Sequence, residues 1–505
     1  MHKIYLTPDD QLVLDPTGKA RDAIRNCKAS KPTPVPSIFS SYDYQSYRDE
    51  WRALAARSIP TKYSYLHEYD ESLWTKYAPQ GAKVDFQDLL AILARSYRNA
   101  THNVVRKRTV LTGKKYFIRL VKSIIGRVGV PTPLDGYRGT VGTAASLPTM
   151  VKKGDFLAET VGISPGLFGH VYPDRPGQRN MRNSVRLVHM DANPNVRLVE
   201  ELFSRVRKWL VSYLPCFFAA WIRPDKVLDP SIYQQLMRGA FTVEGDFDKC
   251  DEHLSYDIAI EILDVYDLLL DPMESVALRS YIEQAFQQPV YCGDYLIVGK
   301  HNAFSGLPYV SDFETIYDIF LQIGVLLELG LNVEKFFITA LGDDMLIMGR
   351  MSTQLQTEIR DAITEEANAN GHVMQKAKCR LGQGDVLYLR RMKALGMPLF
   401  YGENGPYIKG HYPLSLATLS IVLPEHYEPD IHYQWGALFQ RLDNVHGSPY
   451  WKLYLEFILS RTKKTLRSCA KEAKARDDWW TRLFGESWNP ETSPSFQQAI
   501  RSGLV

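Results

Sequence analysis

One short segment restricts the possible folds of this chain more than any other. Residues 336–350, FFITALGDDMLIMGR, form two apolar stretches around Gly342, Asp343 and Asp344. Apolar runs of this length around a glycine-containing turn predict a β-hairpin with both carboxylates at its tip. Two like charges held together disfavour each other's ionised form unless a cation lies beside them. The segment therefore predicts an antiparallel sheet with an acidic, cation-binding tip.

Regular elements flank this hairpin along the chain. Residues 241–247, FTVEGDF, have the composition of a strand, and residues 372–380, HVMQKAKCR, are expected to form another. Three segments have the apolar spacing of helices, namely residues 255–270, 309–329 and 352–371. The order strand, helix, helix, hairpin, helix, strand is typical of an α+β fold with helices on one face of an antiparallel sheet.

A second acidic group lies at the end of the first strand. Residues 245–255, GDFDKCDEHLS, place Asp246 and Asp251 five residues apart. Phosphoryl transfer from a nucleotide needs hard oxygen ligands for two Mg²⁺ ions about 3.5–4 Å apart. Carboxylates on neighbouring strands can bridge such ions, whereas Cys and His suit softer metals. A solvated acidic turn would explain the hairpin alone, but the additional carboxylates favour metal-dependent phosphate chemistry.

Composition excludes several classes of protein. A chain of 505 residues with 45% hydrophobic and 23% charged residues is typical of a globular protein with several subdomains. The six cysteines form no CxxC pair, which indicates a reduced, intracellular protein without structural zinc. The N-terminus lacks the apolar run of a signal peptide, and the longest apolar stretch, residues 319–333, is interrupted by Gln322 and Glu328. We therefore expect no contact with a membrane.

Basic residues gather in two clusters, although the net charge is only +3. The first basic cluster comprises Arg95, Arg98, Arg106, Lys107, Arg108, Lys114, Lys115, Arg119, Lys122 and Arg127. The second basic cluster comprises Arg461, Lys463, Lys464, Arg467, Lys471, Lys474 and Arg476. Either one alone is as well explained as solvated surface. Two such clusters around an acidic centre favour a channel for a polyanion.

Three motifs together resemble those of viral RNA-dependent RNA polymerases. GDFDKCDEHLS resembles motif A, FSGLPYVSDFET (residues 304–315) resembles motif B, and LGDD resembles motif C. Their order is that of the family, with about sixty residues from Asp246 to Ser305 and nearly forty more to Asp343. The chain length and the DFDKCD motif are most similar to the polymerases of picobirnaviruses and partitiviruses, which have segmented double-stranded RNA genomes.

The resemblance implies a right-hand polymerase with fingers, an antiparallel-sheet palm and a helical thumb. The expected divisions are 1–80 as an N-terminal segment bridging fingers and thumb, 81–240 as fingers, 241–264 as the palm around motif A, 265–300 as a fingers insertion, 301–392 as the palm with motifs B to E, and 393–505 as thumb and C-terminal tail.

The resemblance also assigns roles to the four carboxylates. Asp246 and Asp343 would be the principal ligands of two Mg²⁺ ions, for which Mn²⁺ can substitute, and Asp344 would assist. Asp251 would bind the ribose 2′-hydroxyl, the group that distinguishes RNA precursors from DNA precursors. Reverse transcriptases usually carry a bulky residue at the position of Asp251 and an aromatic residue or Ala before the double Asp. Leu341 and Gly342 therefore favour an RNA polymerase.

Motif B departs from the family's usual form. Ser305 and Gly306 fit it, and Gly306 would let the loop move as template advances. Counting strictly, the positions of the family's Thr and Asn are Val310 and Glu314. A slip of one residue gives Ser311 and Thr315, which share a helix face, and this is the reading we prefer for nucleotide binding.

The remaining motifs lie on either side. Residues 178–191 resemble motif F, in which Arg182 and Arg186 would hold the triphosphate, although a plain basic strand explains either equally well. Motif D would supply Lys376 or Lys378 as general acid for the pyrophosphate, and strand spacing puts both on one face, so the choice stays open. Residues 385–392, DVLYLRRM, resemble motif E, which supports the 3′ end of the growing strand.

The resemblance thus implies template-directed RNA synthesis from NTPs, for replication and transcription of a viral genome. The expected partners are RNA template and product, NTPs and a viral capsid protein, and the expected location is the virion interior or host cytoplasm. The alternatives are a reverse transcriptase-like templated polymerase and an RNA-binding protein with a catalytically dead palm.

Overall fold

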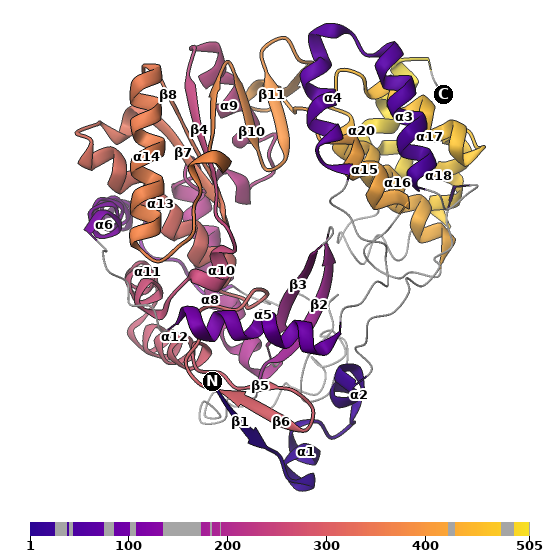
Figure 1. Cartoon of the computed structure of the whole chain (residues 1–505). Coiled ribbons are helices and arrows are strands. Elements are labelled where there is room, and N and C mark those ends of the chain that lie inside the picture. The colour runs from indigo at the N-terminus through magenta and orange to yellow at the C-terminus, as the bar shows by residue number, and fades with distance from the viewer. Residues whose placement is uncertain are drawn as a thin grey trace.

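The computed structural model describes residues 1–25, 38–39, 44–74, 85–100, 108–134, 173–181, 184–191, 193–422, 430–475 and 489–503. Helices and small antiparallel sheets form a ring in Figure 1, with a four-stranded sheet on one side and the C-terminal helices on the other. The expected α+β class is confirmed. Within the described residues, no helix is both long and apolar enough to cross a membrane.

The largest sheet contains the predicted strand and hairpin. Its order is β7-β8-β4-β9, and each neighbouring pair is antiparallel. The strands are β4 (Phe241–Asp246), β7 (Phe336–Leu341), β8 (Asp344–Gly349) and β9 (Arg380–Gln383). The expected strand over residues 372–380 is wrong, because its middle forms the 3₁₀ helix η6 (Lys376–Lys378) before β9 begins. Met374 makes an isolated antiparallel bridge with Phe247, and its own N–H and carbonyl bond the side chain of Asn368 at 3.2 and 3.0 Å.

The remaining strands form smaller antiparallel sheets. One sheet has three strands, in which β6 (Tyr295–Val298) pairs with both β1 (His2–Tyr5) and β5 (Val290–Tyr291). The others are two-stranded pairs: β2 (Arg175–Met181) with β3 (Ser184–Met190), β10 (Asp385–Tyr388) with β11 (Arg391–Ala394), and β12 (Leu399–Gly402) with β13 (Gly405–Ile408).

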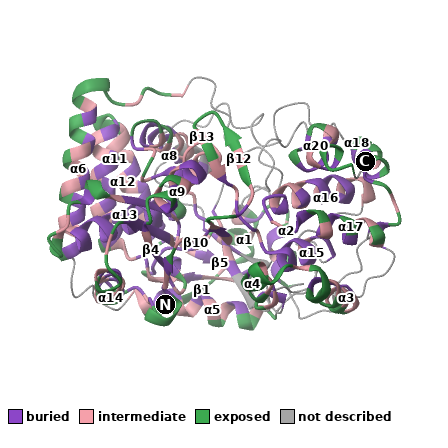
Figure 2. Ribbon diagram, turned by 90° about the horizontal axis from the view of Figure 1, so that it is seen from above, coloured by how far each residue is buried: buried purple, intermediate pink, exposed green. Residues whose placement is uncertain are grey.

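The three predicted helices are present as α11 (Tyr256–Leu269), α13 (Val310–Glu328) and α14 (Thr353–Ala369). Two further helices, α10 (Cys250–His253) and α12 (Pro272–Ala285), lie on either side of α11 and were not predicted. The hydroxyls of Ser255 and Ser352 cap α11 and α14 by accepting backbone N–H bonds. Figure 2 shows α13 buried along most of its length. A helix that is buried nearly all round belongs to the core, and α13 packs behind the sheet.

Two glycines bring the backbones of α13 and α6 (Arg108–Val128) unusually close. A Cβ atom on Gly113 would lie 1.8 Å from the carbonyl oxygen of Phe320, and one on Gly324 would lie 2.1 Å from that of Thr109. Neither backbone oxygen can move aside as a side chain could. Each helix therefore supplies the glycine that the other needs for this crossing.

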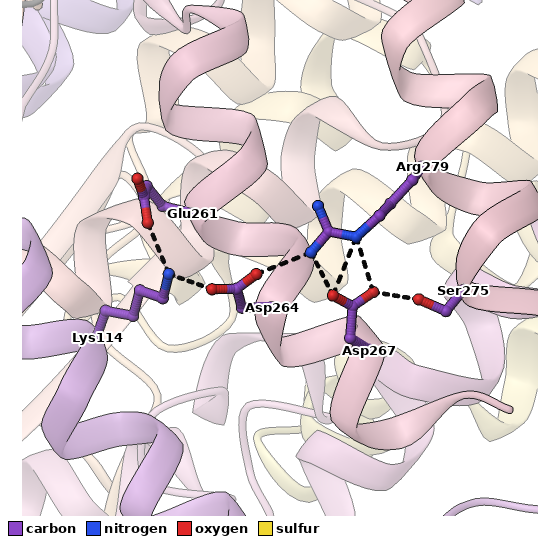
Figure 3. A network of polar contacts seen from close by, with 6 residues as sticks. All are labelled: Lys114, Glu261, Asp264, Asp267, Ser275 and Arg279. Atoms are coloured by element: carbon purple, nitrogen blue, oxygen red, sulfur yellow. Dashed lines mark hydrogen bonds and ion pairs between the residues drawn. The ribbon is translucent and has the colours of Figure 1, made fainter. Parts of the chain in front are cut away.

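A charged network fixes the other side of α6. Lys114 donates to Glu261 at 2.6 Å and also pairs with Asp264, which Arg279 contacts at 2.8 Å (Figure 3). Arg279 and Ser275 of α12 both bond Asp267 of α11. The Lys114 side chain is only 11% exposed. Its charge therefore serves the fold, although the sequence groups it with a basic surface.

The N-terminal segment contacts two separate cores. Its first part, β1, α1 (Pro8–Leu14) and α2 (Lys19–Arg25), packs beside β5 and β6. Its later helices, α3 (Tyr44–Ser58) and α4 (Ser64–Glu71), join the core of the C-terminal helices through Trp51 and Leu66. Those helices are α15 (Leu414–Val422), α16 (Ile431–Val445), α17 (Trp451–Thr462), α18 (Leu466–Lys474) and α20 (Pro494–Arg501). The remaining long helices are α5 (Phe86–Asn99), α8 (Asn193–Tyr213) and α9 (Leu228–Met237).

The glycine crossing predicts opposite effects for two alanine substitutions on α6. Gly113→Ala should lower the free energy of unfolding by roughly 1–3 kcal/mol or more, because the methyl group meets backbone. Gly126→Ala is the matched control, since nothing lies within 4 Å of the added Cβ, and it should raise stability by about 0.5–1 kcal/mol. Urea denaturation of both variants measures the difference. Equal effects would contradict the close crossing.

Candidate active site

The acidic groups of the hairpin and of β4 meet at one end of the sheet. Asp246, the last residue of β4, lies directly opposite Asp344, the first residue of β8. Asp343 occupies the turn between β7 and β8 together with Gly342, whose φ of 57° is in the left-handed region. The predicted meeting of these three carboxylates at one place is therefore confirmed as a backbone arrangement.

Thr315 of α13 holds this turn in place. Its hydroxyl accepts the N–H of Gly342 at 2.9 Å and donates to the carbonyl of Ser311 at 2.6 Å. Thr315 is fully buried, so this hydroxyl serves the hairpin. Ser311 is exposed on the first turn of α13. Neither Ser311 nor Thr315 is among the described residues that line the cavity beside the hairpin.

The cavity has a volume of about 780 Å³ and is lined by three of the other predicted residues, Asp251, Ser305 and Lys378. Five aspartates line it, namely Asp246, Asp248, Asp251, Asp343 and Asp344. The basic side chains on its wall are Arg95, Lys249, Lys378, Arg380 and Arg390. A concave site with carboxylates and cations together suits a ligand that carries both phosphate and metal.

Asp251 lies on α10 at the edge of the cavity. It is 7% exposed, and its Oδ1 accepts the N–H of Glu252 at 2.9 Å. Glu252 in turn makes a two-bonded pair with Arg95 of α5, with both N–O distances 3.0 Å. This pair holds α10 against α5. One member of the first basic cluster thus reaches the cavity, but with its charge already paired.

The motif B loop packs against β3. Ser305 lines the cavity, and its carbonyl accepts the N–H of His189 at 2.7 Å. Gly306 has a φ of 98°, and a Cβ there would lie 2.6 Å from the His189 carbonyl oxygen. The ring of Phe304 stacks between His189 and His301, at centroid distances of 3.8 and 3.7 Å. Position 306 thus needs glycine because of its positive φ and its close packing against β3. Motif B in the sequence had instead suggested that this glycine serves mobility of the loop.

The two candidate lysines point to different places. Lys378 lines the cavity and lies 3.8 Å from Asp248. Lys376 pairs with Asp361 at 3.3 Å and Glu365 at 3.2 Å, both on α14. The expected strand would have placed both lysines on one face, whereas the 3₁₀ turn separates them.

The motif F segment forms the β2–β3 hairpin, as its strand character predicts. Arg186 lies on β3 opposite Arg179, and its side chain is outside the described part of the structure, as is Arg182 altogether. Leu187 and His189 of the same strand line the cavity. The strand itself therefore runs along the site.

Several residues of the cavity were not identified from the sequence. Glu244 lies two residues before Asp246, so strand periodicity alone could have placed both on one face. Its Oε1 accepts bonds from Arg380 at 2.7 Å and from the Leu387 N–H at 2.9 Å, which ties β9 and β10 to β4. Burial raises the pKa of Glu244 to about 7, against the influence of Arg380.

A further carboxyl group lies behind the hairpin. Both carboxyl oxygens of Asp318 on α13 are buried without a hydrogen-bond partner among the described residues. Burial raises its pKa well above the ordinary value, and the negative charges of Glu314 and Asp343 raise it further. Asp318 is therefore stabilised in its neutral form, which limits the negative charge behind the turn.

The carboxylates supply the donor type that Mg²⁺ prefers, but they do not form a closed coordination shell. Within the described ranges, no three Asp, Glu, His or Cys side chains converge closely enough to hold an ion. Asp246, Asp343 and Asp344 nevertheless share one cavity, and two of them are direct neighbours in register. The residues present thus fit a magnesium centre in chemistry and in backbone position.

Comparison with known proteins identifies the fold. A crystal structure of the RNA-dependent RNA polymerase of a human picobirnavirus matches 99% of this chain and 100% of its own, with a TM-score of 0.76 and 17% identity. The insertion-loop deletion mutant of a human picobirnavirus polymerase matches over the same shares, with a TM-score of 0.79 and 16% identity. No family model and no curated protein matches. The chain therefore has the fold of these polymerases, and the predicted resemblance is confirmed at that level.

Proposed function

We propose that this chain is an RNA-dependent RNA polymerase, which synthesises RNA from NTPs on an RNA template. The observation that carries the proposal is the gathering of Asp246, Asp343, Asp344 and Asp251 in one cavity of a chain with this fold over its whole length. Carboxylates from two strands beside basic side chains suit nucleotidyl transfer. The same proposal includes an RNA template and product as partners.

Asp246, Asp343 and Asp344 would hold the two Mg²⁺ ions. When bound, such ions activate the attacking 3′-hydroxyl and neutralise the triphosphate. Thr315 and the sheet register keep the three carboxylates in place before any ion arrives. Lys378 on the cavity wall is better suited than Lys376 to give a proton to the leaving pyrophosphate, because Lys376 is paired with α14.

Other groups would bind the nucleotide and the RNA. Asp251 and Ser305 on the cavity wall are candidates for the sugar, and Arg182 and Arg186 for the triphosphate. Ser311 and Thr315 would act on the nucleotide only through the motif B helix, given where their hydroxyls lie. On α6, Lys115, Arg119, Lys122 and Arg127 are exposed and could attract RNA phosphates.

We also propose the right-hand division with the boundaries expected from the sequence. Supporting observations are the antiparallel sheet around β4, the helical core formed mainly after residue 393, and the N-terminal segment, which pairs with β6 and also joins that helical core. Replication of a viral double-stranded RNA genome, a capsid protein partner, and a place in the virion interior or host cytoplasm belong to the same proposal.

Asp343→Asn tests the proposed reaction. The variant should keep the fold and lose RNA synthesis by at least about a thousandfold, because a neutral amide cannot replace a carboxylate ligand of the ions. Synthesis is measured with purified protein, single-stranded RNA, four NTPs and Mg²⁺, followed by sizing of the product. Asp294→Asn, at an exposed aspartate paired with Arg25, is the control and should be fully active. Full activity of Asp343→Asn would refute the assignment.

The two lysines provide a matched pair for the general acid. Lys378→Met should lower kcat about 10²-fold or more, because the pyrophosphate then leaves without a positioned proton donor. Lys376→Met should change kcat little, since Lys376 serves α14. Single-nucleotide incorporation measured over pH 6–9 distinguishes them. A larger loss in Lys376→Met would reverse the assignment.

Sugar selection tests Asp251. Asp251→Ala should lower rNTP use more than dNTP use and reduce the ratio between them roughly ten- to a hundredfold, because only the ribose offers a 2′-hydroxyl to this carboxylate. Steady-state kcat/KM values for matched rNTP and dNTP pairs give the ratio. Equal losses for both sugars would make Asp251 a structural or metal-binding carboxylate and would favour the reverse transcriptase-like alternative.

A further inference from the structure

Part of the cavity wall comes from outside all the polymerase-like motifs. Tyr69 of α4 lines the cavity, together with Leu73, two residues beyond the end of α4, and Leu416 of α15. These three side chains are aromatic or aliphatic, in a cavity whose other lining residues include five aspartates. A flat ring with aliphatic neighbours suits the face of a nucleobase better than it suits phosphate or a cation.

The neighbouring residue holds Tyr69 in position. Asp70 is fully buried, and its carboxylate accepts the N–H of Leu414 at 2.9 Å and the hydroxyl of Tyr450 at 3.0 Å. It also lies 3.0 Å from Nε2 of His411. All three partners lie beyond residue 393, so α4 cannot shift without breaking these bonds. The helix that carries Tyr69 is thus fixed in position before any ligand binds.

Tyr69 lies near the catalytic hairpin. Burial raises the pKa of its phenol, and the charges of Asp344 and Arg390 also act on that group. Arg390 sits in the turn between β10 and β11, where it and Leu389 have φ values of 61° and 51°. Tyr388 of the same hairpin reaches the Asp344 carbonyl at 3.5 Å. Left-handed residues other than glycine persist where the surroundings fix them, and this turn borders the site.

We propose that the ring of Tyr69 stacks on the nucleobase of the initiating nucleotide, the one that supplies the first 3′-hydroxyl when synthesis starts without a primer. The inference rests on the proposed polymerase function. A base at the end of a paired product strand is already stacked on the preceding base pair. An initiating nucleotide has no such neighbour, so a protein ring contributes most at this step.

Two reactions distinguish a role in initiation from a role in every nucleotide addition. The first is dinucleotide formation on a single-stranded template, measured at varied concentrations of the initiating nucleotide. The second is one-nucleotide extension of an annealed RNA primer. Tyr69→Leu should raise the KM for the initiating nucleotide roughly 5- to 150-fold with little change in kcat. Tyr69→Phe keeps the ring and should stay within about twofold of the parent chain. Primer extension should be unchanged in both variants.

Tyr65→Leu is the matched control, because Tyr65 lies on the same helix, is 36% exposed and is absent from the described cavity wall. It should leave both reactions unchanged. Equal losses of Tyr69→Leu in both reactions would overturn the proposal, and so would a Tyr69→Phe variant as impaired as Tyr69→Leu, since the hydroxyl would then be the important group.

A measurement on the unaltered chain covers the case in which Tyr69→Leu fails to fold. With a template that ends in cytidine, 8-azido-GTP serves as initiating nucleotide and is photolysed in place, and the proposal expects labelling at Tyr69. Labelling elsewhere would overturn it. An unaltered chain that extends primers but never starts without one would overturn this proposal alone. An unaltered chain inactive in both reactions would overturn the polymerase function as well.

Discussion

Repulsion among carboxylates is the constraint on which the rest of this structure depends. Asp246 and Asp344 lie opposite each other on the neighbouring strands β4 and β8, and Asp343 lies in the turn beside them. Such charges favour separation when no cation lies between them, so the hairpin must be held by other forces. The apolar sides of β7 and β8 provide one, through buried residues such as Ile347. The hydrogen bond from Gly342 to Thr315 provides another, and burial raises the pKa of Asp318, which disfavours further negative charge behind the turn.

Because α13 carries both Thr315 and Asp318, its own position decides where the carboxylates lie. The glycine crossing with α6 determines how deeply α13 sits, and the pairing of Lys114 with α11 holds α6 from the other side. The geometry of the acidic site thus depends on α6, none of whose residues is among the described residues that line the cavity. This dependence explains why a basic residue that looks like surface in the sequence is buried.

The sequence predicted those parts of the site whose determinants are local. Strand-like composition, apolar runs and helical spacing located β4, the hairpin and α13, because buried elements are rich in apolar residues. The 3₁₀ turn at Lys376 could not be predicted, since it depends on the side chain of Asn368 bonding Met374. Gly306 fits motif B in the sequence, but only the structure reveals that β3 excludes a Cβ there. Tyr69 left no pattern at all, because its place depends on contacts of Asp70 with residues more than three hundred positions away.

The N-terminal segment has a physical consequence for the cavity as a whole. Its first strand pairs with β6 in one part of the molecule, and its helix α4 is bonded into the C-terminal core. Both parts line the cavity. Arg95 and Ser305 belong to the part that contains β6, and Tyr69 and Leu416 belong to the part that contains the C-terminal core. A change in the relative position of the two cores would therefore alter the cavity without disturbing either core internally. Since the first strand of the segment is bonded to one part and α4 is bonded to the other, the shape of the site depends on both attachments.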